Sequence, residues 1–159
     1  ARKKRDKAAA AAAKAAGYYR RDGNLAACFE SLYLQALALF ENGETGAAEQ
    51  VLRAFLPEAK KQRTSFHIAG AYNLMGLIFL RRREETAAKV WFQEAAALER
   101  KNDRYTAAAA DYANIGLIEL HQGNAEQARK NLQTAVACAE TFGKNGFSRM
   151  LNEKLQKLN

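Results

Sequence analysis

The sequence repeats itself at a fixed interval, and this repetition limits the folds open to the chain. The segment AYNLMGLIFLRRREETAAKVWFQEAA, which starts at Ala71, aligns with DYANIGLIELHQGNAEQARKNLQTAV, which starts at Asp111. A further shift by the same interval places SLYLQALALFENGETGAAEQVLRAFL, from Ser31, in the same frame. We therefore expect three copies of one structural unit.

Each copy contains two runs of apolar residues at helical spacing, separated by a break. In the third copy the first run is marked by Tyr112, Ile115, Gly116 and Leu120, and the second by Ala128, Leu132, Ala135 and Val136. The breaks ENGE, HQGN and KND supply Asn, Gly and Asp, which terminate and cap helices. The unit is predicted to be helix, turn, helix. The many alanines and the single proline favour an all-α fold throughout.

Two residues conflict with this pattern. Arg83 takes the turn position that Gly43 and Gly123 hold in the other copies. A left-handed arginine would cost about 1 kcal/mol, so we expect either a different turn or a helix that continues through RRREE. Pro57 falls inside a second helix and removes one backbone hydrogen bond, so we expect a kink or an early end near Leu56.

The chain, 1–159, is predicted to form one domain. Its segments are a basic, alanine-rich leading helix at 1–23, three repeats at 24–62, 63–102 and 103–142, and a capping helix at 143–159. The leading helix is either the second helix of an earlier unit, with Ala8 at the position of Ala48, or an alanine-rich linker helix. The apolar stripe of the capping helix comprises Phe147, Met150, Leu151, Leu155 and Leu158.

These residues resemble the tetratricopeptide repeat (TPR). The second copy matches the family pattern at Tyr72, Met75, Gly76, Phe79, Ala88, Phe92 and Ala95, and the third at Tyr112, Ile115, Gly116, Ala128, Leu132 and Ala135. The first copy matches less well, and Gln35 and Glu119 stand where the family has apolar residues. The 40-residue period is similar to the long unit of Pins-type adaptors and of kinesin light chains.

The resemblance implies an α-α superhelix, or TPR solenoid, of antiparallel helix pairs whose first helices line a concave groove. Nine groove positions, carried over residue by residue, are Tyr33, Leu37, Phe40, Asn73, Leu77, Arg81, Asn114, Leu117 and His121. The same carry-over also gives Glu30, Glu41, Gly70, Leu80, Ala110, Ala113 and Leu120 as groove-facing. Leu37, Leu77 and Leu117 would form an aliphatic ladder. Burial of these leucines between helices is the alternative, since apolar stripes commonly belong to a core.

Some TPR proteins grip the terminal carboxylate of a partner with Lys, Asn and Arg. The matching positions here hold Tyr33, Leu37, Leu74, Ala110 and Asn114, so that clamp is absent apart from Asn114. A mixed ligand fits better, apolar along the leucines and polar at Asn73 and Asn114, because an amide side chain both donates and accepts hydrogen bonds.

The sequence offers little for catalysis. His67 and His121 are isolated, and we interpret both as surface or helix-end residues. There is no His, Cys, Asp or Glu cluster at metal-ligand spacing and no glycine-rich phosphate loop. We therefore expect no enzyme activity, no metal and no cofactor. Cys28 and Cys138 are predicted to be buried thiols, which suits a soluble cytoplasmic protein, and no run approaches the length of a membrane span.

The predicted function is that of a protein-protein interaction scaffold, or adaptor, which binds a peptide or helix of a partner protein. One alternative is the TPR sensor region of a larger signalling or transcription regulator. Another is binding to nucleic acid or a membrane surface through residues 1–22, whose eight Lys and Arg against two Asp supply +6 of the net charge of +8. Nucleic acid is disfavoured because only Tyr18 and Tyr19 lie near a basic cluster. The oligomeric state stays open.

Overall fold

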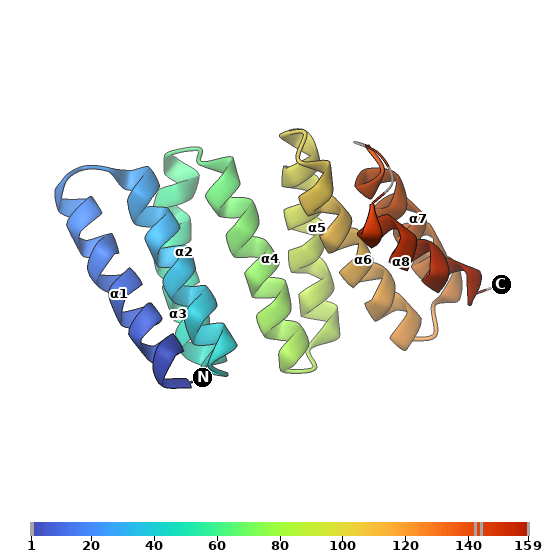
Figure 1. Ribbon diagram of the computed structural model, residues 1–159, viewed down its shortest axis with the longest axis horizontal. Helices are drawn as coiled ribbons and strands as arrows, with labels where there is room; N and C mark the ends of the chain where they lie inside the picture. The colour runs from blue at the N-terminus through green and yellow to red at the C-terminus, as the bar shows by residue number, and fades with distance from the viewer. Residues whose placement is uncertain (1, 142, 144, 159) are drawn as a thin grey trace. The chain divides into compact units, whose positions relative to one another are not determined.

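The computed structural model describes residues 2–141, 143 and 145–158, and the predicted segment limits at 1, 142 and 159 lie outside them. Within this part all regular structure is helical, which confirms the predicted all-α fold (Figure 1). The helices are α1 (Arg2–Arg21), α2 (Leu25–Glu41), α3 (Thr45–Lys61), α4 (Ser65–Arg81), α5 (Glu85–Lys101), α6 (Tyr105–His121), α7 (Ala125–Ala139) and α8 (Gly146–Gln156).

The chain divides into two compact units, Ala1–Arg82 and Arg83–Asn159. In the first unit α2 contacts α1, α3 and α4, and α3 also contacts α4. In the second unit α6 contacts α5 and α7, while α7 contacts α8. Each unit is thus built from consecutive helices packed on one another.

The turns between helices recur at a regular interval, half that of the sequence repeat. The left-handed residue of each turn is Gly23, Gly43, Arg63, Arg83, Asp103, Gly123 or Gly143. The N–H of the following residue reaches back to a carbonyl near the end of the preceding helix, as in Glu44 to Leu39 at 2.9 Å and Asn124 to Glu119 at 2.8 Å. This bond closes the last turn of the helix and satisfies a carbonyl that would otherwise lack a donor.

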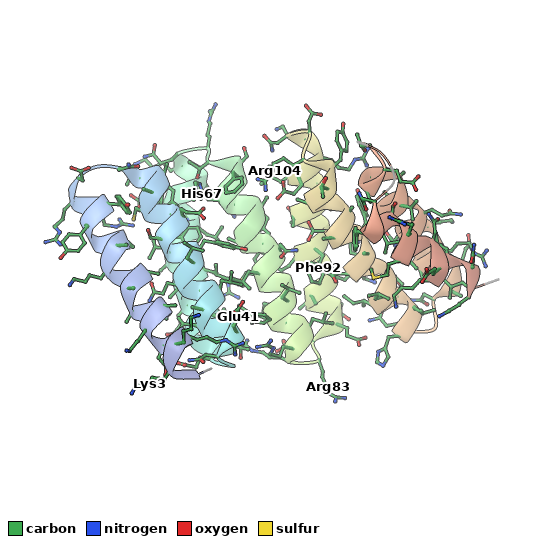
Figure 2. The ribbon with its side chains drawn as sticks, viewed as in Figure 1. Lys3, Glu41, His67, Arg83, Phe92 and Arg104 are labelled. Atoms are coloured by element: carbon green, nitrogen blue, oxygen red, sulfur yellow. The ribbon has the colours of Figure 1, made fainter. Side chains whose placement is uncertain are left out.

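Arg83 adopts the same left-handed conformation as the glycines, with φ of 63°. α4 ends at Arg81, so both sequence expectations for this turn, a different turn and a continued helix, were wrong. The Arg83 side chain is exposed and extends away from the turn (Figure 2), so it clashes with nothing. The preceding Arg82 binds Glu49 at 2.7 Å and holds the end of α4 in place.

Pro57 lies within α3, which continues to Lys61 and has 17 residues, as α5 does. The predicted early end near Leu56 was therefore wrong. Leu56 and Ala59 are both buried on either side of the proline. Their packing offsets the hydrogen bond that Pro57 cannot donate.

α6 and α7 approach each other closely at Gly116. A Cβ atom at this position would lie 2.8 Å from Cγ of Leu132 and 3.2 Å from the Ala128 carbonyl oxygen. Leu132 and Ala128 are fully buried, as the repeat pattern predicts. The corresponding residue of α2, Ala36, is also fully buried.

The first and last helices differ from their predicted patterns. α1 buries Ala9 and Ala16, whereas Ala8, the residue expected to match Ala48, is exposed. α8 begins with a capping box in which the Asn145 and Ser148 side chains exchange bonds with each other's backbone N–H. Its stripe has Leu151 buried and Phe147, Leu155 and Leu158 partly buried. Met150 is 44% exposed, so its assignment to the stripe was wrong.

Candidate partner-binding surface

All nine predicted groove residues lie on the first helices of the repeats. In the first unit they are Tyr33, Leu37 and Phe40 of α2, and Asn73, Leu77 and Arg81 of α4. In the second unit they are Asn114, Leu117 and His121 of α6. None of the nine is fully buried: Arg81, Leu117 and His121 are exposed and the others are half-buried. Below, the first-helix surface means the six residues of the first unit together with the three of the second, each set on its own unit.

Tyr33 packs across the space left by a glycine. Its Cε2 atom lies 3.5 Å from the point where a Cβ of Gly70 would be, so the missing side chain lets the ring of α2 approach α4. Burial, and then the charge of Glu30, raises the pKa of Tyr33 above its ordinary value of 10.0. The phenol therefore stays neutral at physiological pH and keeps a hydroxyl that can donate or accept a hydrogen bond.

The Arg81 side chain stacks on the Phe40 ring at the C-terminal end of α2. The Arg81 guanidinium carbon lies 3.8 Å from the centroid of the Phe40 ring, and Arg81 also donates to the Phe40 carbonyl. Beside it, Arg5 donates to the Glu41 carbonyl at 3.0 Å and pairs with the Glu41 carboxylate at 3.5 Å. Two arginines thus neutralise the negative end of the α2 dipole. Arg81 is held in a fixed position while its charge stays exposed.

An aromatic cluster lies at the opposite end of the same unit, where Figure 2 places His67 far from Glu41. The His67 ring meets Phe29 and Phe66 edge-on, at centroid distances of 6.0 and 5.2 Å. Its Nε2 atom is 3.6 Å from a carboxylate oxygen of Glu30. His67 belongs to the first turn of α4, in agreement with its predicted helix-end position. The sequence did not predict the cluster, because it joins Phe29 of α2 to two rings of α4.

In the second unit, α6 presents Leu117 and Leu120 to solvent, with 37% and 39% of each exposed. His121 is also exposed and its Nδ1 atom lies 2.6 Å from Glu85. Ala113, which was predicted to face the groove, is buried in a cluster with Leu132 and Leu151. That prediction was wrong because α8 supplies Leu151 to this part of the unit and covers Ala113.

Glu119, which departs from the TPR pattern that the sequence resembles, is the centre of a partly buried polar cluster. Its two carboxylate oxygens accept from Lys89 at 2.9 Å and from Asn124 at 2.7 Å. These hydrogen bonds, that of Lys89 first, hold the pKa of Glu119 below its ordinary value of 4.5. The position therefore joins α5 to α6 through a charged pair where the family uses apolar contacts.

Across residues 2–141, 143 and 145–158, no three His, Cys, Asp or Glu side chains are placed to hold a metal ion. No helix among these residues is both long enough and apolar enough to cross a bilayer.

The fold is similar to that of a known structure, the crystal structure of BtubC (BKLC) from P. vanneervenii, with a TM-score of 0.80 and 18% sequence identity. The similarity covers 97% of this chain and 65% of that chain, so the present sequence spans about two thirds of its length. It places this chain among all-α helical-repeat proteins. No family model matches the sequence, and no curated protein matches it.

Proposed function

We propose that this chain is a non-catalytic protein-binding scaffold of the tetratricopeptide type, which uses the first-helix surface to hold an extended or helical segment of a partner. The observation that carries the proposal is the position of Leu37, Leu77 and Leu117. These leucines recur at the interval of the sequence repeat, and none is fully buried. Aliphatic side chains kept accessible in the same register of the first helices are what a repeat protein uses to bind an apolar segment.

The polar neighbours of the leucines define the chemistry of the partner. Asn73 and Asn114 are half-buried, and a half-buried amide can bond a peptide backbone as both donor and acceptor. Arg81, fixed by Phe40, adds a positive charge. The partner is therefore a segment with apolar side chains at intervals and carbonyl or carboxylate groups between them.

Two features support the non-catalytic part of the proposal. His67 lies beside Glu30 and His121 beside Glu85, so each histidine has a carboxylate neighbour. Cys138 is buried, and burial raises the pKa of its thiol, which disfavours the reactive thiolate. Two buried free thiols also suit a reducing compartment, so we place the scaffold in the cytoplasm.

The test is retention of partner proteins from a native extract by the immobilised chain. Leu77→Glu and Asn114→Ala should each reduce retention, because one puts a charge against the apolar segment and the other removes an amide. The control is Val90→Glu, which puts the same charge on a residue of α5 that is 52% exposed. Equal loss in the control, or unfolding of Leu77→Glu by circular dichroism, would assign these residues to another role.

A further inference from the structure

The basic residues of α1 are divided between two faces of the helix. On the inner face, Arg5 pairs with Glu41 at 3.5 Å and Arg20 pairs with Glu58 at 2.8 Å. Both arginines are therefore used within the first unit, where they tie α1 to α2 and α3.

The outer face of α1 carries a line of exposed cations. This outer basic stripe consists of Lys3, Lys7, Lys14 and Arg21. Spacings of four and seven keep these side chains on one side of a helix, because a heptad makes nearly two turns. At about 1.5 Å per residue the stripe is about 27 Å long. Figure 2 shows Lys3, at one end of it, pointing away from the unit.

No carboxylate within the described residues pairs with the stripe. Asp6, the single acidic residue of α1, accepts a hydrogen bond from Asn42 of the α2 end instead. The Lys14 Nζ and Arg21 Cζ atoms lie 6.0 and 4.9 Å from the centroid of the Tyr18 ring. Tyr18 is itself 54% exposed. The stripe is thus a row of uncompensated positive charges with one aromatic ring in it.

We propose that the outer basic stripe binds the surface of an anionic lipid bilayer, with α1 lying parallel to the membrane plane. A plane can meet all four charges of a straight row at once. The phosphate backbones of a duplex wind around its axis and would meet such a row only at intervals. Clustered Lys and Arg on a helix are attracted to the negative potential of anionic lipids, and Tyr18 is a residue type that favours the membrane interface.

The contact is electrostatic and does not involve insertion. Between Lys7 and Lys14 the outer face carries only alanines such as Ala10 and Ala11, both exposed. A helix that enters the acyl region needs large apolar residues on that face. Each Lys or Arg near an anionic surface contributes about five-fold in membrane partitioning. Salt should weaken the binding, since the Debye length falls from about 10 Å at 0.1 M to about 3 Å at 1 M.

The experiment measures cosedimentation of the chain with phosphatidylcholine vesicles that contain phosphatidylserine. Lys7→Gln/Lys14→Gln should reduce partitioning about 25-fold, from two charges at about five-fold each. The matched control is Lys61→Gln/Lys101→Gln, which removes the same charge from exposed residues at the ends of α3 and α5. The control should lose no more than about two-fold.

Three results would overturn the proposal. The first is equal loss in the two variants, which would make net charge and not the stripe the cause. The second is equal binding to vesicles of pure phosphatidylcholine. The third is a loss of duplex RNA binding in the stripe variant with vesicle binding unchanged, which would identify nucleic acid as the partner. Partner retention by the first-helix surface is a separate readout, so each proposal can fail without the other.

Discussion

Gly116 of α6 lies directly against Leu132 of α7, with 2.8 Å between the leucine Cγ and the point where a Cβ would stand. Real Cβ atoms do not approach other carbons so closely. Since Leu132 is fully buried, it cannot move aside without disturbing its own neighbours.

Gly116→Leu should therefore destabilise the protein by about 1–3 kcal/mol through overpacking, measured as the free energy of unfolding in urea. The control is Gly17→Ala. Gly17 is also inside a helix, but a Cβ there would meet nothing within 4 Å. That substitution should stabilise α1 by about 0.5–1 kcal/mol through helix propensity. A neutral Gly116→Leu would show that α6 and α7 pack less closely than described.

Arg83→Gly should stabilise the protein by about 1 kcal/mol, because glycine adopts a positive φ without the steric cost that a Cβ brings. The φ of 63° at Arg83 is the observation behind this expectation. Gly43→Arg, at the same turn position one period earlier, should lose a similar amount. Denaturant midpoints of both variants check the pair, and equal midpoints would mean that the turn relaxes around either residue.

Pro57→Ala should stabilise α3 by about 1–3 kcal/mol, since alanine restores the backbone N–H that proline lacks. The reciprocal variant is Ala97→Pro, at the equivalent exposed position of α5. It should lower the thermal midpoint, because the packing around Ala97 has not been adapted to offset a missing backbone hydrogen bond. If Ala97→Pro is neutral, this position of the second helices tolerates a missing hydrogen bond.

The Lys89–Glu119 pair should make stability fall in acid. Because the pKa of Glu119 is lowered in the folded state, the unfolded state protonates this carboxylate first as the pH falls. The stabilisation is therefore complete above pH 4.5, the ordinary glutamate value, and is lost as the pH falls through the lowered value. Glu119→Gln should remove this part of the pH dependence in urea unfolding series. Glu126→Gln should change it little, because Glu126 and Lys130 form an exposed pair.

The repeat register predicted most of the core. Ala88, Phe92 and Ala95 are fully buried as the pattern requires, because the same helical spacing meets the same packing in each copy. Arg83 and Pro57 were misjudged for one reason. The local conformational cost of each residue, about 1–3 kcal/mol, is smaller than the free energy gained by packing the adjoining helices within their own units. Tertiary contacts therefore determine the backbone conformation at both positions.

The candidate surface stays a prediction from the sequence, and its contacts could not be predicted. The sequence left groove and core open for Leu37 and Leu77, and both are half-buried in the structure. The stacking of Arg81 on Phe40 joins residues of two different helices, and sequence spacing within a helix carries no information on such pairs. Ala113 failed because the burial of a small residue depends on which helix covers it, here α8.

The turns at 23, 43, 63, 83, 103, 123 and 143 also fix the rules by which this chain can be cut and rejoined. Removing the segment 44–83 would leave α2 followed by α5, a first helix followed by a second helix, with a left-handed residue still at the junction. Removing only 44–63 would bring α2 and α4 together, two helices of the same kind, each presenting the wrong face. We therefore expect that segments of this chain can be deleted or exchanged in pairs of helices but not as single helices.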